Sequence, residues 1–134
     1  FFDVDHFKRF NDDHGHDQGD RVLQAIGKVM GEHFRDVDLC FRYGGEEFCA
    51  ILPSTGNPGC GLAAERFRQK IEAMEVDGLK ITISIGVAVY PDAGTSPTDM
   101  LKKADIALYE AKENGRNQVC FAVPDNDKPP TSSS

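Results

Sequence analysis

The sequence predicts a single α+β domain, and three observations support this class. Ile81 to Val89 alternates large apolar residues with small or polar ones, which is the pattern of a β-strand. Two strand-like segments flank the pair Gly44-Gly45, and this arrangement predicts a β-hairpin. Two longer segments place apolar residues at helical spacing. Because hairpins and mixed connections join these elements, α+β is favoured over a regular βαβ series.

The first part of the chain is expected to hold a strand and two helical segments. Phe1 to Asp5 is the end of a strand, and His6 to Asp13 is a short helical turn with Phe7 and Phe10 on one face. Asp20 to Phe34 is an amphipathic helix. Its apolar positions are Val22, Leu23, Ile26, Val29, Met30 and Phe34.

A hairpin and a second helix follow. Leu39 to Arg42 and Glu47 to Leu52 are its two strands, and the glycine pair between them allows the positive φ of a tight turn. Pro53 to Gly61 is a loop rich in proline and glycine. Leu62 to Met74 is the second amphipathic helix. Its apolar positions are Leu62, Ala63, Phe67, Ile71 and Met74.

The last part contains the strand Ile81 to Val89, a third helix and a final strand. Ser96-Pro97-Thr98-Asp99 combines a capping hydroxyl, a proline at the first helical position and an acid, which mark a helix start. The helix runs to about Asn114 and ends at Gly115. Gln118 to Val123 is the last strand, and the polar segment 124–134 is expected to be disordered.

Length and charge narrow the possible functions. The chain has 134 residues, of which 40% are hydrophobic, and a domain of this size buries roughly two-thirds of its unfolded surface. Its 15 basic and 22 acidic residues give a formal net charge of -7. This balance argues against a nucleic-acid partner or broad adhesion to anionic membranes. A phosphate ligand remains possible where a few basic side chains and a metal ion hold it.

The four cysteines, Cys40, Cys49, Cys60 and Cys120, form no C-x-x-C pair and no zinc-like pattern with histidine. We interpret them as free thiols of a cytoplasmic domain. No apolar stretch approaches the length of a membrane span, and no signal peptide is visible. The chain opens without a methionine, inside an expected strand. We therefore expect a fragment of a longer protein, whose sensor domain or membrane anchor lies elsewhere.

Acidic residues gather at two points of the expected sheet. Asp3 and Asp5 are two apart at a strand end, so their side chains point the same way in a regular strand. Glu46 and Glu47 directly follow the glycine pair, which leaves room for close approach of a ligand. If the first strand pairs with the hairpin, Asp3 and Glu46 converge at one end of the sheet. Such oxygen ligands suit Mg²⁺, which binds one or two carboxylates together with phosphate oxygens.

Basic residues near these acids have the chemistry for binding phosphate. Phe7 and Lys8 begin the first helical turn, whose backbone N–H groups favour anions. Lys112 and Arg116 are four residues apart at the end of the last helix, so they can reach one triphosphate. Their structural explanation is a surface cation pair that complements the helix C-terminus.

Asn11 and Asp20 suit the edge of a purine. A carboxylate accepts hydrogen bonds from the N1–H and N2–H₂ donors of guanine, and an amide both donates and accepts. Both residues also have a structural explanation as helix caps. Taken singly, each of these features favours the structural explanation. The functional interpretation depends on their occurring together.

Six ordered blocks give the chain a specific resemblance. They are DVDHFKRFND (3–12), GHDQGD (15–20), GGEEF (44–48), ITISIGVA (81–88), ADIALYEAK (104–112) and GRNQV (115–119). In this order and spacing they resemble the GGDEF domain of bacterial diguanylate cyclases, in its GGEEF form. The resemblance covers nearly all of residues 1–121, whereas a lone GGEEF would be weak evidence.

The resemblance implies a fold, a reaction and a cofactor. The fold is a central five-stranded, mostly antiparallel sheet surrounded by helices, as in nucleotidyl cyclases and polymerase palms. The reaction is the condensation of two GTP molecules into cyclic di-GMP with release of two pyrophosphates, and the cofactor is Mg²⁺ or Mn²⁺. The domain spans residues 1–123 and is truncated at its N-terminus, because the family's first strand usually begins several residues before Asp3.

Site roles follow from the same resemblance. Asp3, Glu46 and the carbonyl of Val4 would bind the metal ion. Glu46 would also be the base for the 3′-hydroxyl, and Glu47 is its acidic neighbour with a less defined part in catalysis. Lys8 would stabilise the transition state. The substrate-binding residues would be Phe7, Lys8, Asn11, His16, Asp20, Gly44, Gly45, Lys112 and Arg116.

The resemblance also implies partners. One domain holds one GTP, and the attacking hydroxyl belongs to the other GTP, so two domains must face each other. We therefore expect an active homodimer whose activity rises faster than linearly with protein concentration. We also expect an upstream sensor domain in the full-length protein.

A second motif matches the family's R-x-x-D inhibitory site. Arg35 and Asp38 stand at the expected distance before Gly44. Arg35 would bind a phosphate or guanine of the product cyclic di-GMP, and Asp38 would accept from guanine N–H donors. Arg66 or Arg68 of a second domain is a candidate to complete this site. The alternative explanation is an ordinary loop between a helix and a strand.

Three other functions compete with the cyclase. They are a non-catalytic receptor that binds cyclic di-GMP through Arg35 and Asp38, a regulatory GTP-binding module, and an interaction domain without nucleotide. Receptors of this family usually have a broken GGEEF, and here the motif is intact. The cyclase is therefore the preferred hypothesis.

Overall fold

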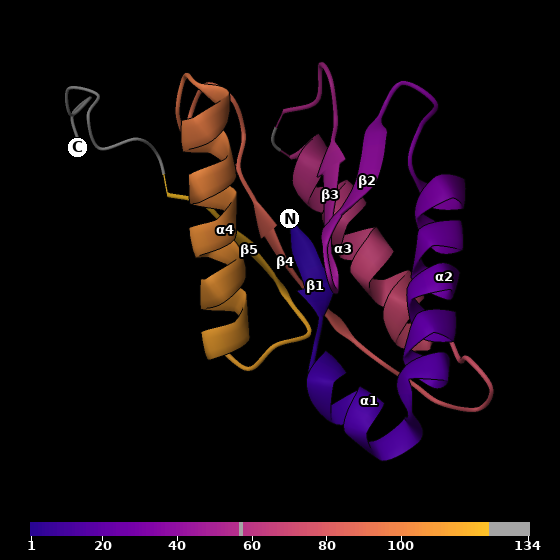
Figure 1. Cartoon of the computed structure of the whole chain (residues 1–134). Helices are drawn as coiled ribbons and strands as arrows, with labels where there is room; N and C mark the ends of the chain where they lie inside the picture. The colour runs from indigo at the N-terminus through magenta and orange to yellow at the C-terminus, as the bar shows by residue number, and fades with distance from the viewer. Residues whose placement is uncertain (57, 124–134) are drawn as a thin grey trace.

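The computed structural model describes residues 1–56 and 58–123. In this part of the chain, helices cover both faces of a five-stranded sheet, with α4 on one side and α2 and α3 on the other (Figure 1). The elements are β1 (Phe2–Val4), α1 (Phe7–His14), α2 (His16–His33), β2 (Leu39–Gly44), β3 (Glu47–Ile51), α3 (Gly59–Ala73), β4 (Ile83–Val87), α4 (Pro97–Glu113) and β5 (Val119–Phe121). The segment 124–134, expected to be disordered, lies outside the described residues.

The strand order is β2-β3-β1-β4-β5. β1 pairs antiparallel with β3 and β4, β2 pairs antiparallel with β3, and only the β4–β5 pair is parallel. The predicted class, an α+β fold with a five-stranded and mostly antiparallel sheet, is confirmed. None of the helices in the described ranges is long and apolar enough to cross a membrane.

The two central strands, β1 and β4, are buried on both faces. Phe2 lies opposite Ile85 on the face covered by α2 and α3. Its ring stacks on Phe48 with centroids 5.1 Å apart and meets the edge of Phe67 of α3 at 5.0 Å. Because side chains alternate along a strand, Asp3 lies on the opposite face, toward α4. A buried acid is thereby placed beneath a helix.

Gly86 of β4 sets how closely α4 approaches the sheet. A Cβ atom at this position would lie 2.2 Å from the backbone oxygen of Ala104 and 2.3 Å from the backbone nitrogen of Leu108. Both contacts are with helix backbone, which cannot yield as a flexible side chain does. Only glycine permits the observed packing, which brings the last turn of α4 over β1.

Two helices begin earlier than the sequence predicts. α2 starts at His16 rather than Asp20, and Gly15 with φ 91° occupies its N-cap. The first turn of α2 is polar and exposed, so hydrophobic periodicity could not reveal it. As a result Asp20 lies inside the helix, and its explanation as a helix cap is wrong. α3 starts at Gly59 rather than Leu62, and Leu62 is exposed rather than part of the apolar face.

The hairpin forms as predicted, but its glycines have a different part. Neither Gly44 nor Gly45 has a left-handed φ, so the expectation of positive φ in this turn is wrong. The register shifts between Arg42 and Gly44, which indicates a β-bulge at Tyr43, and a bulge changes the local twist that primed turns otherwise provide. The Arg42 side chain also donates to the Gly45 carbonyl at 2.7 Å.

Helix α4 begins where the sequence predicts. The Ser96 hydroxyl accepts a hydrogen bond from the Asp99 N–H at 3.1 Å, and Pro97 is the first helical residue. The strands β4 and β5 are shorter than the predicted segments 81–89 and 118–123. Strand ends depend on pairing partners, which periodicity does not specify.

The Gly86 contact predicts a large effect of adding one methyl group. Gly86→Ala is expected to lower the free energy of unfolding by about 3 kcal/mol, because α4 must move away from the sheet. Gly27→Ala is the matched control, since a Cβ there meets nothing within 4 Å. The control should raise stability by about 0.5–1 kcal/mol through helix propensity. Urea unfolding measures both, and equal stability of the two variants would contradict the proposed packing constraint.

Candidate functional site

The candidate site lies where β1 ends, beside the β2–β3 turn and the last turn of α4. β1 and β3 pair so that Asp3 lies opposite Glu47, and Glu46 directly precedes it in the turn. The charge of Glu46 acts on Asp3, where it contributes to a raised pKa of the Asp3 carboxyl. The structure therefore brings the acids of the first strand and the turn into one place.

Asp3 is a buried carboxylate with only one of its oxygens paired. Its side chain is 5% exposed, and Lys112 of α4 donates to Oδ2. Oδ1 is buried and has no hydrogen-bond partner among the described residues. Burial is the main reason that the pKa of Asp3 lies above its ordinary value of 3.8, and the Lys112 ammonium opposes this shift.

The free oxygen of Asp3 fits a cation ligand. The described residues contain no group of three or more His, Cys, Asp or Glu side chains that could hold a metal ion. The predicted ligands are two carboxylates and the Val4 carbonyl, so they form a smaller set than that. Mg²⁺ is commonly held by one or two carboxylates and completes its coordination with water and phosphate oxygens. The donors present thus fit a hard divalent ion that binds together with a nucleotide.

Asp5 has a different task from Asp3. Its Oδ1 accepts from the Ser84 hydroxyl at 2.5 Å, and its Oδ2 accepts from Thr82 Oγ1 at 2.7 Å and from the Asn117 N–H at 2.9 Å. The residue is buried. With three donors on its two oxygens, this carboxylate joins the end of β1 to β4 and to the loop after α4.

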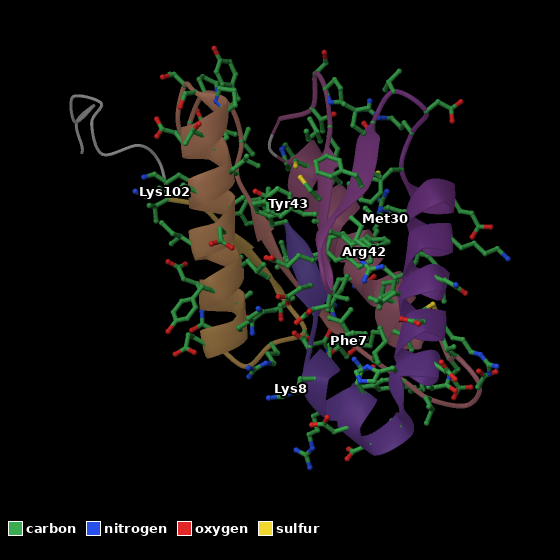
Figure 2. All side chains as sticks on the ribbon, viewed as in Figure 1. Phe7, Lys8, Met30, Arg42, Tyr43 and Lys102 are labelled. Carbon is green, nitrogen blue, oxygen red and sulfur yellow. The ribbon has the colours of Figure 1, made fainter. Side chains whose placement is uncertain are left out.

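The start of α1 presents backbone donors beside the acids. His6 occupies the N-cap with φ 56° and ψ 34°, and no side chain caps the helix. The first N–H groups of α1 are therefore not used by a capping side chain. Lys8 points away from the ribbon into solvent (Figure 2), and Phe7 is half-buried. This arrangement suits an anion held by N–H groups and one ammonium.

The α1–α2 junction contains the second unpartnered oxygen of the structure. Asn11 Oδ1 is buried without a hydrogen-bond partner among the described residues. It lies against Gly19, where a Cβ atom would be only 1.8 Å away. Asp20 is the next residue of α2 and is exposed, as is His16 at the start of the helix. A polar atom with no partner beside two exposed polar residues fits a purine edge.

The two cations at the end of α4 do not act together in this structure. Lys112 is paired with Asp3, whereas Arg116 lies in the loop after α4 with a left-handed φ of 65°. That both reach one triphosphate remains a prediction.

Gly44 and Gly45 leave open space at the β2–β3 turn, because a Cβ on either would meet no atom closer than 3.8 Å.

Arg35 and Asp38 form a separate cluster between α2 and β2. Arg35 Nη2 donates to Asp38 Oδ1 at 2.9 Å, to the Pro53 carbonyl at 3.1 Å and to Thr55 Oγ1 at 2.8 Å. The hydrogen bond from Arg35 lowers the pKa of Asp38. The R-x-x-D pair is thus formed in advance and anchored to the loop after β3.

Arg68 is engaged by residues of its own domain. Its side chain is 12% exposed and forms ion pairs with Glu65 and Glu72 of its own helix. It also donates to Asn117 Oδ1 at 2.7 Å. Of the two arginines expected to complete the inhibitory site, Arg66 is the one that is exposed, and the role of either remains a prediction.

Sequence reasoning missed three residues of this region: Asp5 as an anchor, Gly19 and Asn117. All three stand inside the blocks DVDHFKRFND, GHDQGD and GRNQV. Their positions were therefore visible, but the contacts that define their roles join segments far apart in the chain.

Comparison with known proteins identifies the family. The family model described as "Diguanylate cyclase, GGDEF domain" matches residues 1–118. The chain belongs to the GGDEF family. Diguanylate cyclase A of Treponema denticola is 44% identical to this GGDEF domain over 124 residues, which are 90% of this chain and 33% of that protein. The response regulator PleD of Caulobacter vibrioides is 41% identical over 87% of this chain and 27% of its own length.

Solved structures of the family share the fold. The active GGEEF domain of a diguanylate cyclase from Vibrio cholerae matches with a TM-score of 0.85 and 34% identity, over 92% of this chain and 81% of that one. The GGDEF domain of DgcB from Caulobacter crescentus, in complex with c-di-GMP, matches with a TM-score of 0.83 and 34% identity, over 90% and 74% of the two chains. The chain spans about a third of the length of the first curated relatives it matches.

The orphaned oxygen of Asp3 predicts that this residue lowers stability. Asp3→Asn should raise the melting temperature in EDTA at pH 7 by about 4 °C, because burial of the Asp3 charge costs more than its pairing with Lys112 returns, and a neutral amide avoids about 1 kcal/mol of that cost. The folded state binds the Asp3 proton more tightly than the unfolded state, since burial raises this pKa. Wild-type stability therefore falls as the pH rises above 3.8 through the raised pKa, and the advantage of the variant grows over the same range.

Thermal unfolding at pH 4 and pH 7 checks this expectation. Asp12→Asn, at an exposed position of α1, is the matched control and should leave the melting temperature unchanged. A wild type as stable as Asp3→Asn at pH 7 would show that the Asp3 carboxylate carries no burial penalty.

Proposed function

We propose that this GGDEF domain is a diguanylate cyclase, which condenses two GTP molecules into cyclic di-GMP and releases two pyrophosphates. The observation that carries this proposal is the buried Asp3, with a free oxygen beside the charge of Glu46 in an intact GGEEF turn. Relatives over 40% identical are named diguanylate cyclases. The activity of the longer protein to which such a domain would belong is part of the same proposal.

Asp3, Glu46 and the Val4 carbonyl would hold Mg²⁺ or Mn²⁺. When bound, such an ion polarises a phosphate oxygen and lowers the pKa of a neighbouring hydroxyl. Asp3 Oδ1 is buried and has no partner among the described residues, so Asp3 would have an oxygen available for such an ion.

Phosphate groups would be held from two sides. The N–H groups at Phe7 and Lys8 and the Lys8 ammonium face the phosphates from α1, and Lys8 takes up charge that develops in the transition state. Lys112 and Arg116 would hold the β and γ phosphates. Lys112 pairs with Asp3 in the free domain, and it would be free to bind phosphate if Asp3 were bound to the metal ion instead.

Guanine would be recognised at the α1–α2 junction. Asp20 accepts from the N1–H and N2–H₂ donors that guanine has and adenine lacks, and the unpartnered Asn11 Oδ1 accepts another hydrogen bond. His16 would contact the nucleoside from the start of α2. Selectivity for GTP over ATP follows, because adenine would leave the carboxylate unpaired.

The chemical step needs two domains. Glu46 would accept the proton of the 3′-hydroxyl, aided by its neighbour Glu47, as that oxygen attacks the α-phosphorus of the GTP on the facing domain. The new 3′-O–P bond forms while the bond between α-phosphorus and the β-bridging oxygen breaks, and pyrophosphate leaves. The same step in the opposite direction closes the ring, which makes the active species a homodimer.

Product inhibition would act through Arg35 and Asp38. The Arg35 side chain is exposed, and the Asp38 carboxylate that accepts from it is only 2% exposed. A guanidinium fixed in this way suits the phosphates and guanine of cyclic di-GMP. Arg66 of another domain would complete the site. The same preformed pair supports a second candidate function, a non-catalytic module that binds cyclic di-GMP or GTP and regulates a partner domain.

The surroundings of the domain are also part of the proposal. Because relatives are about three times longer, we infer an upstream sensor domain that controls the pairing of two GGDEF domains. The domain itself would work in the cytoplasm, where GTP and Mg²⁺ are present, and its full-length protein would be free or membrane-anchored.

Turnover of GTP tests the proposal directly. Incubation with GTP and Mg²⁺ followed by product separation should yield cyclic di-GMP, at a rate that rises faster than linearly with protein concentration. Glu46→Gln should lower the rate at least about a hundredfold, because it removes a metal ligand and base. Glu32→Gln, at an exposed position of α2, is the control and should leave the rate unchanged.

The possible outcomes separate the candidate functions. Binding of GTP without product would support the regulatory module instead of the cyclase. A rate strictly proportional to concentration, down to dilutions at which the protein is monomeric, would contradict the two-domain site.

The inhibitory pair predicts a selective effect. Arg35→Ala should raise the concentration of cyclic di-GMP needed for half-inhibition at least about tenfold, because it removes charge-assisted hydrogen bonds to the product. The initial rate without added product should stay within about twofold of wild type. Arg21→Ala, which removes an exposed arginine that pairs with Asp77, is the control. Unchanged inhibition of Arg35→Ala would remove this site from the proposal.

A further inference from the structure

The loop between α4 and β5 has an unusual backbone. Arg116 has φ 65° and Asn117 has φ 47°, so two consecutive non-glycine residues are left-handed. Such residues are uncommon and persist where their surroundings hold them in place. The loop also connects the last turn of α4, which carries Lys112, to the strand beside β4. The conformation of this loop therefore fixes the position of the Arg116 Cα atom and the direction in which its side chain leaves the backbone.

Asn117 is held from three directions. Its N–H donates to Asp5 Oδ2 at 2.9 Å. Its side-chain Nδ2 donates to Glu72 Oε2 at 2.6 Å, and its Oδ1 accepts from Arg68 Nη1 at 2.7 Å. The backbone N–H of Asn117 is therefore held by Asp5, which follows β1, and both ends of its amide are held by residues of α3.

The groups that hold Asn117 are themselves fixed. Asp5 is buried, and the hydroxyls of Thr82 and Ser84 occupy its carboxylate. The Asp5 N–H also donates to the Thr82 carbonyl at 2.9 Å. On the α3 side, Arg68 forms two hydrogen bonds to the Glu65 carboxylate, at 2.8 Å and 2.6 Å. Asn117 thus rests on a rigid frame of sheet and helix.

The chain neighbours of this frame belong to the candidate site. Arg116 precedes Asn117, and Val4 precedes Asp5. The Gln118 side chain adds hydrogen bonds to the carbonyls of Arg116 at 3.1 Å and Asn114 at 3.0 Å. A loop that only had to turn could use glycine at position 117 without strain. Here an asparagine is used, and its amide ties the phosphate side of the site to α3.

We propose that Asn117 is a positioning residue that presents Arg116 to the terminal phosphates of the nucleotide. This inference rests on the proposed function, because it assumes a triphosphate near Arg116. Asn117 itself does not touch the substrate. Its amide is held by Arg68 and Glu72, and its backbone N–H is held by Asp5. These contacts fix the loop between α4 and β5, which carries Arg116, relative to the end of β1.

Asn117→Gly is the most informative variant. Glycine keeps the left-handed backbone and the N–H to Asp5, and it removes only the amide held by α3. Binding is measured in Mg²⁺ with two probes, the non-cleavable α,β-methylene analogue of GTP and GMP, which lacks the β and γ phosphates. The variant should bind the triphosphate analogue about tenfold more weakly than wild type, as expected for a misplaced cation. Its affinity for GMP should stay within about twofold.

Two further variants control the result. Asn114→Gly is a matched substitution at the exposed C-cap of α4, where the side chain has no part in the frame, and it should bind both probes like wild type. Glu72→Ala removes the acceptor on α3 and leaves Asn117 in place. It should reproduce the selective loss for the triphosphate analogue, by about threefold, even if Asn117→Gly folds poorly.

Each outcome has a defined meaning. Equal affinity of Asn117→Gly and wild type for the triphosphate analogue would overturn the inference and leave the proposed function intact. An equal loss for GMP and the analogue, together with a lower melting temperature, would also overturn it, because the residue would then serve only the fold. A wild-type protein that binds neither probe would contradict the proposed function itself.

Discussion

The site depends on a carboxylate buried in the middle of the sheet. Asp3 lies on a central strand under α4, and burial of a charge is unfavourable unless it is paired. Lys112 supplies one partner, and it reaches Asp3 because Gly86 lets α4 approach the strand. The other oxygen has no partner. A core position that would stabilise the domain as an apolar residue is therefore occupied by a group that suits a cation.

The two strand-end acids show how neighbours of one type differ in role. Asp5 uses both oxygens within the protein, on Ser84, Thr82 and the Asn117 N–H, and so it stabilises the junction of β1, β4 and the loop after α4. Asp3 keeps one oxygen free. The carboxylate of Asp5, with all of its partners inside the protein, positions the strand end, whereas that of Asp3 has an oxygen left for the proposed metal ion.

The two unpaired polar atoms belong to residues that are proposed to contact the metal ion and the guanine base. One is on Asp3 and the other on Asn11, the only two buried side-chain oxygens or nitrogens without a partner in the described residues. The start of α1, which has no side-chain cap, lies between these two residues in the chain. Because native proteins seldom leave such atoms unpaired, both positions are consistent with the proposed contacts to a metal ion and to guanine.

Local patterns in the sequence determined most of the elements, the hairpin, the Ser96 cap and the identity of the acids and cations, because alternation, helical spacing and capping are properties of neighbouring residues. They could not show that α2 begins at His16, since its first turn is polar, nor that Gly44 and Gly45 avoid positive φ, since a bulge at Tyr43 changes the twist. Tertiary structure alone decided that Asp5 has hydrogen-bond partners on both oxygens whereas Asp3 does not, and that Arg68 pairs with residues of its own domain. Those outcomes depend on contacts between residues distant in the chain, and no local pattern encodes them.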